Sequence, residues 1–99
     1  MSKRWIFQDI KDAADEVLYK GSSMAEIEKN VPAYYERLRE KVDPETYVRY
    51  ELWTCDIYVD IEYILYVTAA IYGDRVTRDQ VSAWVLKHKE PHQVLTFDA

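Results

Sequence analysis

The chain has 99 residues, a size that predicts one folded domain with a single hydrophobic core. Hydrophobic residues make up 48% and charged residues 31%, which excludes a disordered chain, and the net charge of −5 offers nucleic acid no overall attraction. A lone cysteine, Cys55, excludes an internal disulfide and a cysteine zinc cluster, so we expect a reducing, cytoplasmic setting. The first 16 residues show no pattern of a secretory signal and no run of about 20 apolar residues occurs, so we expect a soluble protein without a membrane partner.

The first 42 residues predict two helices. Apolar residues recur at helical spacing over residues 4–20, and Gly21 can adopt the left-handed conformation that ends a helix. Ser23 and Glu26 form a capping box that opens a second helix over residues 24–42. Because Pro32 lies inside that segment, it is either one kinked helix or two short helices.

Residues 44–72 predict one long central helix. Asp43 and Pro44 suit its N-cap and first position, and Gly73 suits its C-cap. The competing prediction is two strands, since Tyr, Val and Ile favour sheets and residues 57–67 partly alternate in polarity. A hairpin would have to turn at residues 54–56, where Gly, Pro and Asn are all absent, so we favour the helix.

A last helix is expected over residues 78–89, opened by a capping box of Thr77 and Gln80 and ended before Pro91. The tail from His92 is too short to assign. The sequence therefore predicts an all-α, compact four-helix domain over residues 1–99, with the long helix at its centre.

The predicted long helix has two apolar faces, and after Glu62 it carries no charge, so we expect its last third to be buried. Its aromatic face is covered either by the chain's own helices or by a second protein, for which Tyr and Trp are favoured contact residues. Two glutamates border apolar surface and, if not functional, would form ion pairs with Arg37 or Lys41 of the neighbouring helix. The candidate partner-binding residues are Tyr47, Tyr50, Trp53, Tyr58, Glu51 and Glu62.

Catalytic chemistry has little support in the sequence. His88 and His92 have a metal-ligand spacing, but Pro91 lies between them and no third ligand is evident. The chain has two glycines in all, so it has no glycine-rich phosphate loop. We expect no metal, no cofactor and no catalytic residue; an enzyme that uses Glu51 or Glu62 is the distant option.

Residues 69–85, AAIYG followed by VTRDQVSAWV after Asp74 and Arg75, resemble a helix-turn-helix motif. The resemblance implies a DNA-binding regulator that uses residues 69–89. The alternative is a terminal helix that packs through its apolar residues, within an acidic protein poorly suited to phosphates. The residues that the resemblance points toward DNA are Arg78, Gln80, Ser82 and Lys87.

The segment VPAYYERL, residues 31–38, is similar to a piece of the phage DNA-mimic antirestriction proteins. In size and acidity the chain also resembles small helical inhibitors, such as phage anti-defence and bacteriocin immunity proteins. The sequence therefore favours a non-enzymatic helical protein that binds and inhibits another protein, with a homodimer as a further option and the DNA-binding regulator as the alternative.

Overall fold

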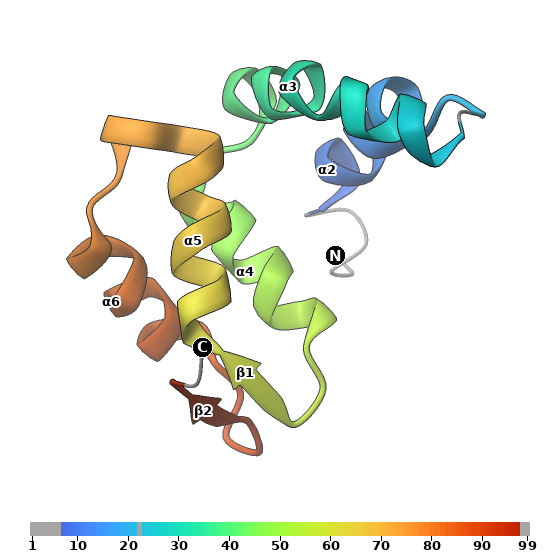
Figure 1. Ribbon diagram of the computed structural model, residues 1–99. Coiled ribbons are helices and arrows are strands. Elements are labelled where there is room, and N and C mark those ends of the chain that lie inside the picture. The colour runs from blue at the N-terminus through green and yellow to red at the C-terminus, as the bar shows by residue number, and fades with distance from the viewer. Residues whose placement is uncertain (1–6, 22, 98–99) are drawn as a thin grey trace. The chain divides into compact units, whose positions relative to one another are not determined.

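The computed structural model describes residues 7–21 and 23–97 of the chain. The chain divides into two compact units, Met1–Asp43 and Pro44–Ala99. The described residues form α-helices and a single pair of three-residue strands, so the predicted all-α class is confirmed (Figure 1). The number of helices is wrong, because five α-helices replace the four expected. The single domain over residues 1–99 stays a prediction.

In the first unit, α2 (Gln8–Ala13) continues directly into the π-helix η1 (Ala14–Tyr19). The backbone then turns through positive φ angles at Lys20 (37°) and Gly21 (69°), which ends the helix where the sequence predicted. The side-chain amide of Asn30 donates a hydrogen bond of 3.0 Å to the Leu18 carbonyl, which would otherwise be left unpaired at the helix end. Residues 4–6 of the predicted first helix lie outside the described residues.

The second helix of this unit, α3 (Met24–Lys41), packs against α2 and η1. The capping box of Ser23 and Glu26 is confirmed. Pro32 lies inside one uninterrupted helix, so the alternative of two short helices is wrong. Arg37 of α3 forms an ion pair of 3.2 Å with Glu16 of η1, which fastens the two helices together at the surface.

In the second unit, the predicted helix over 44–72 is wrong because the chain breaks in its middle. Helix α4 (Pro44–Thr54) begins where expected but ends early. Strand β1 (Tyr58–Asp60) follows, and α5 (Ile61–Tyr72) comes directly after it. The rejected hairpin is absent as well: β1 pairs in parallel with β2 (Val94–Thr96), from the tail that the sequence left unassigned.

The break after α4 is stabilised by one side chain from the far end of the unit. Gln93 is only 4% exposed, and its amide nitrogen donates hydrogen bonds to the carbonyls of Leu52 (3.0 Å) and Asp56 (3.3 Å). The Val94 N–H donates to the Ile57 carbonyl at 2.8 Å. These bonds hold the backbone on both sides of the break, so a helix stop is stabilised without Gly, Pro or Asn.

Helix α5 begins with Asp60 as its N-cap, whose carboxylate accepts a hydrogen bond of 3.2 Å from the Tyr63 N–H. It ends at Gly73 (φ 56°), as predicted, and the short 3-10 helix η2 (Gly73–Arg75) leads to α6 (Arg78–His88). The capping box of Thr77 and Gln80 is confirmed. The two helices α5 and α6 form the crossover that a parallel strand pair requires, and α6 packs against both α4 and α5 (Figure 1).

The buried side chains of the second unit come from all three of its helices and from β1. The expectation that the last third of residues 44–72 is buried all round is wrong. Tyr66 is 66% exposed, and Ala69 and Ala70 of the same helix face are exposed too. None of the helices among the described residues is long and apolar enough to cross a membrane. The most deeply buried residues of this unit are Val48, Val59, Ile64, Thr68, Ile71, Val81 and Val85.

Candidate functional site

The aromatic residues predicted to bind a partner form a row along α4. The ring centroids of Tyr47 and Tyr50 are 6.1 Å apart, and those of Tyr50 and Trp53 are 6.2 Å apart. At its inner end Tyr47 meets Tyr72 edge-on at 6.3 Å and is only 4% exposed, whereas Trp53 at the outer end is 49% exposed. The structure therefore places Tyr47 in the core and Trp53 at the surface, with half-buried Tyr50 between them.

An exposed apolar surface lies where α4 ends and the β1–β2 strand pair begins. Tyr58 is 71% exposed, Ile57 is 47% exposed, and the register partner of Tyr58 on β2, Val94, is 51% exposed. Val59, the next residue along β1, is completely buried because side chains alternate across a strand. We call Trp53, Ile57, Tyr58 and Val94 the apolar corner.

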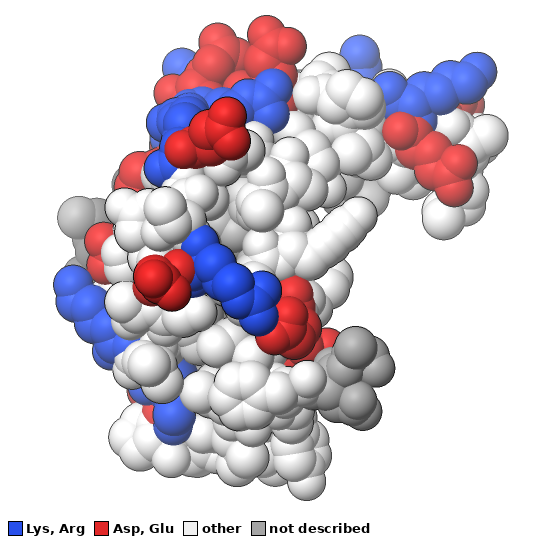
Figure 2. Space-filling view, turned by 60° about the vertical axis from the view of Figure 1, so that its left-hand side comes forward, with Lys and Arg blue, Asp and Glu red and all other residues white. Residues whose placement is uncertain are grey.

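The space-filling view shows uncharged side chains over the lower end of the second unit, at the height where Figure 1 places the two strands (Figure 2). Phe97, directly after β2, adds a further exposed ring (68%). Singly exposed apolar residues are normal on a protein surface, but a cluster of them marks an interaction site. The apolar corner is therefore the strongest candidate for a binding surface among the described residues of this unit.

The acidic candidate Glu51 lies two residues before Trp53 on α4. Its carboxylate accepts a hydrogen bond from the Tyr47 hydroxyl. Burial raises the pKa of Glu51, and the bond from Tyr47 opposes that shift. The nearby thiol of Cys55 also has a raised pKa, first because of burial and then because of the negative charges of Glu51 and Asp60. Within its own unit, Glu51 is thus held by Tyr47.

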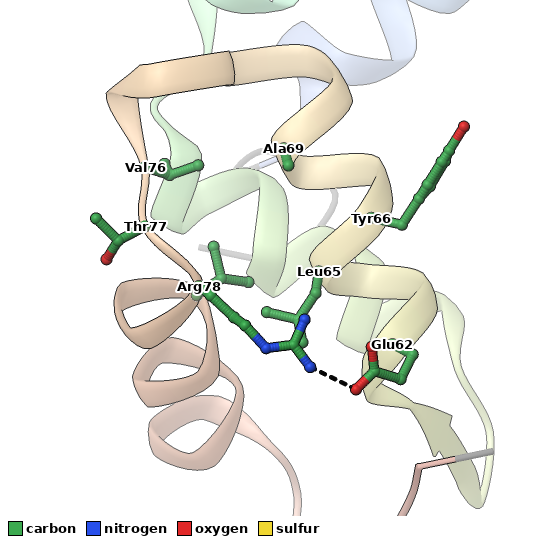
Figure 3. A pocket seen from close by; sticks show the side chains of 8 residues that line it. Glu62, Leu65, Tyr66, Ala69, Val76, Thr77 and Arg78 are labelled. Carbon is green, nitrogen blue, oxygen red and sulfur yellow. Dashed lines mark hydrogen bonds and ion pairs between the residues drawn. The ribbon is translucent and has the colours of Figure 1, made fainter. Parts of the chain in front are cut away.

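A groove of about 230 Å³ lies between α5 and the start of α6 (Figure 3). The Arg78 side chain reaches across it from α6 and pairs with the Glu62 carboxylate of α5 at 2.6 Å. Within its own unit, Glu62 therefore has Arg78 as its cationic partner. Glu62 was a candidate for protein binding and Arg78 a candidate for DNA binding, and the structure pairs the two with each other. The groove is lined by Glu62, Leu65, Tyr66, Ala69, Val76, Thr77, Arg78 and Val81.

Two of the other residues proposed to contact DNA, Gln80 and Lys87, are also engaged within the chain. The Gln80 side chain accepts a hydrogen bond of 2.9 Å from the Thr77 N–H in the capping box. The Lys87 ammonium pairs with Glu45 at 3.3 Å, and Ser82 is half-buried. Asp74 and Arg75 of η2 make the connection between α5 and α6 longer than the turn of a helix-turn-helix motif, as the sequence indicated. The DNA-binding regulator stays a prediction, and the described contacts give it no support.

Sequence reasoning missed Ile57 and Val94 of the corner, and it missed Gln93, which holds the corner's backbone. Val94 and Gln93 lie in the unassigned tail, and no local pattern indicates that this tail returns to the end of α4.

No group of three or more metal-ligating side chains comes together among the residues that the structure describes. Comparisons with protein-family models, curated proteins and solved structures found no match for this chain.

Proposed function

We propose that this chain is a non-enzymatic protein that acts by binding another protein through the apolar corner. The observation that carries the proposal is the exposure of Tyr58 (71%) and of its register partner Val94 (51%), together with that of Trp53 (49%) and Ile57 (47%), which precede Tyr58 in the chain. Aromatic side chains bury a large area with few rotatable bonds, and Tyr and Trp keep a polar group for hydrogen bonding. A cluster of this kind on a small acidic chain favours a protein partner.

The corner is supported by ordered backbone, which favours a binding surface over an accidental exposure. Val59 is fully buried, so the register of β1 directs Tyr58 outward. The Gln93 side chain bonds to the carbonyls on either side of the break, and Tyr50 supports the Trp53 ring at 6.2 Å. A surface organised before binding loses less conformational entropy when a partner arrives.

The two carboxylates that an enzyme could use are both engaged inside the chain. Glu51 accepts a hydrogen bond from Tyr47, and Glu62 pairs with Arg78. These contacts support structural roles for the two glutamates and agree with a non-enzymatic function. Inhibition of the bound protein, as in phage anti-defence or immunity proteins, remains a prediction from size and composition, and so does a homodimer.

The test compares the wild-type chain with variants of the apolar corner in two measurements. One is the capture of proteins by the immobilised chain from an extract of the source organism, and the other is the native mass of the chain in solution. Trp53→Ser combined with Tyr58→Ser should abolish capture of a specific protein, or convert a dimer to a monomer. The single variant Tyr58→Ser should weaken either interaction. The control is Leu86→Ser, which removes an apolar side chain that is 62% exposed on α6. Circular dichroism establishes that each variant is folded.

Equal capture by the wild type and the folded double variant would refute the role of the corner. A wild-type chain that captures nothing and has the mass of a monomer would refute protein binding itself.

A further inference from the structure

The outer face of the β1–β2 pair is an unpartnered sheet face with a mixed character. Tyr58 and Asp60 share this face of β1, since side chains alternate along a strand, and their register partners on β2 are Val94 and Thr96. Tyr58, Asp60 and Val94 are all exposed. The face therefore offers an aromatic ring and an aliphatic side chain with a carboxylate close by.

The chain segment that carries β1 is acidic. Residues 51–74 include five acidic side chains and neither lysine nor arginine. Asp56 and Asp60 flank Tyr58 at two residues on either side, and both are exposed. No Lys or Arg among the described residues pairs with either aspartate. Next to β2, the Lys89 ammonium donates a hydrogen bond of 2.9 Å to the Gln93 carbonyl, so this cation is bound to backbone rather than to either aspartate.

Two further observations indicate that the negative charge reaches the apolar corner. The charges of Glu51 and Asp60 contribute to the raised pKa of Cys55, which lies between Trp53 and Tyr58 in the chain. The negative end of the α4 dipole falls at the same place, because α4 ends at Thr54. An aromatic surface with this electrostatic character is complementary to a cation that can also stack.

We propose that the partner docks a basic, arginine-containing segment on the apolar corner. The guanidinium group stacks on the exposed ring of Tyr58 or Trp53 and pairs with Asp56 and Asp60, while the arginine's methylene groups cover Val94. Arginine fits better than lysine because its planar group stacks on aromatic rings and binds carboxylates with two parallel hydrogen bonds. The net charge of −5 accelerates the encounter with such a segment. This inference rests on the proposed function and specifies the chemistry of its partner.

The first experiment titrates the full-length chain with synthetic peptides in which arginine alternates with serine. Matched peptides carry lysine, glutamine or glutamate in place of arginine. The arginine peptide should bind most tightly, and salt should weaken it. In the NMR spectrum, the amide signals of residues 53–60 and 94–97 should shift. No binding of the arginine peptide, equal binding of the glutamine peptide, or shifts confined to other residues would overturn the inference.

The second experiment separates local charge from overall charge. Asp56→Asn and Asp60→Asn each remove one negative charge, and asparagine preserves the N-cap at residue 60. Each variant should lower the affinity for the arginine peptide by about 2- to 5-fold, the range expected for the loss of an exposed charge pair. The matched control, Glu28→Gln, removes one charge from an exposed side chain of α3 and should leave affinity unchanged. An equal loss in all three variants would show that only net charge matters and would overturn the inference.

The two proposals fail in distinguishable ways. If the double variant of Trp53 and Tyr58 loses the natural partner while the arginine peptide does not bind, the corner is a protein-binding surface and the basic segment is refuted. If the peptide binds the corner while that variant keeps its natural partner, the proposed function is refuted, and with it the inference that the partner docks there.

Discussion

At the scale of single residues, Gln93 holds the backbone at the end of α4, although it lies about 40 positions away in the sequence. Its amide nitrogen donates to the Leu52 and Asp56 carbonyls, and its side-chain oxygen accepts a hydrogen bond of 2.9 Å from the Glu90 N–H. One buried side chain therefore joins the end of α4 to the loop before β2. Buried polar groups that lose such partners are costly.

Gln93→Met keeps the length of the side chain but removes its hydrogen bonds. We expect it to lower the free energy of unfolding by about 2 kcal/mol, because the bonds of the buried side chain to the Leu52 and Asp56 carbonyls and from the Glu90 N–H are all lost. Urea denaturation measures the change. The control is Gln8→Met, since Gln8 is half-buried and its amide nitrogen bonds to Asp12 within α2. A loss no larger than that of the control would contradict the role assigned to Gln93.

Thr68 is the opposite case at the same scale. Its hydroxyl is completely buried and has no hydrogen-bond partner among the described residues. Thr68→Val replaces the hydroxyl with a methyl group of similar shape, so we expect it to raise the free energy of unfolding by about 1 kcal/mol. Thermal and urea unfolding both test this. Thr54→Val, which removes a hydroxyl bonded to the Glu51 carbonyl at 2.8 Å, should bring no such gain; destabilisation by Thr68→Val would refute the prediction.

At the scale of elements, α4 and α6 are joined by a charged cluster. One carboxylate oxygen of Glu45 in α4 lies 2.7 Å from the His88 ring nitrogen and 3.3 Å from the Lys87 ammonium. The hydrogen bond with His88 is the main cause that lowers the pKa of Glu45; burial of the carboxylate opposes this shift, and the contacts with Lys87 add to it. A carboxylate with a lowered pKa stabilises the folded state above its ordinary pKa, and this stability is lost as the pH falls through the lowered value.

We therefore expect Glu45→Gln to be less stable than the wild type at pH 7, with a gap that closes as the pH falls below the ordinary value of 4.5. Denaturation measured across this pH range tests the prediction. Glu28→Gln, in the other unit, should show no comparable gap. A difference between Glu45→Gln and the wild type that is constant with pH would indicate that packing, not charge, is responsible.

The elements also show which sequence signals were sufficient. Both capping boxes and the end at Gly73 were predicted correctly, because each depends on residues within four positions of one another. The break after Thr54 could not be predicted, because the donor that stabilises it lies 37 to 41 positions away. The same distance hid the parallel strands, and with them the outward position of Tyr58.

At the scale of the whole molecule, charge weighs against the DNA-binding alternative. The net charge is −5, and Arg78 and Lys87 are both paired with glutamates. We expect no binding of duplex DNA even at about 50 mM salt, where phosphate attraction is strong. Fluorescence anisotropy with labelled DNA tests this. A salt-sensitive complex that Arg78→Ala weakens, while Glu28→Gln does not, would restore the helix-turn-helix hypothesis.

The sequence by itself determined the helical class, most of the helix boundaries and the acidic character, because these depend on local spacing and on composition. It also singled out the aromatic residues of the second unit, since their number is evident without a fold. Only the tertiary structure decided which of them serve the core and which the surface. It ended α4 through Gln93, paired β1 with β2, buried Tyr47 and left Trp53 and Tyr58 exposed. The physical reason is that burial and helix termination depend on contacts between distant segments, which no local pattern encodes.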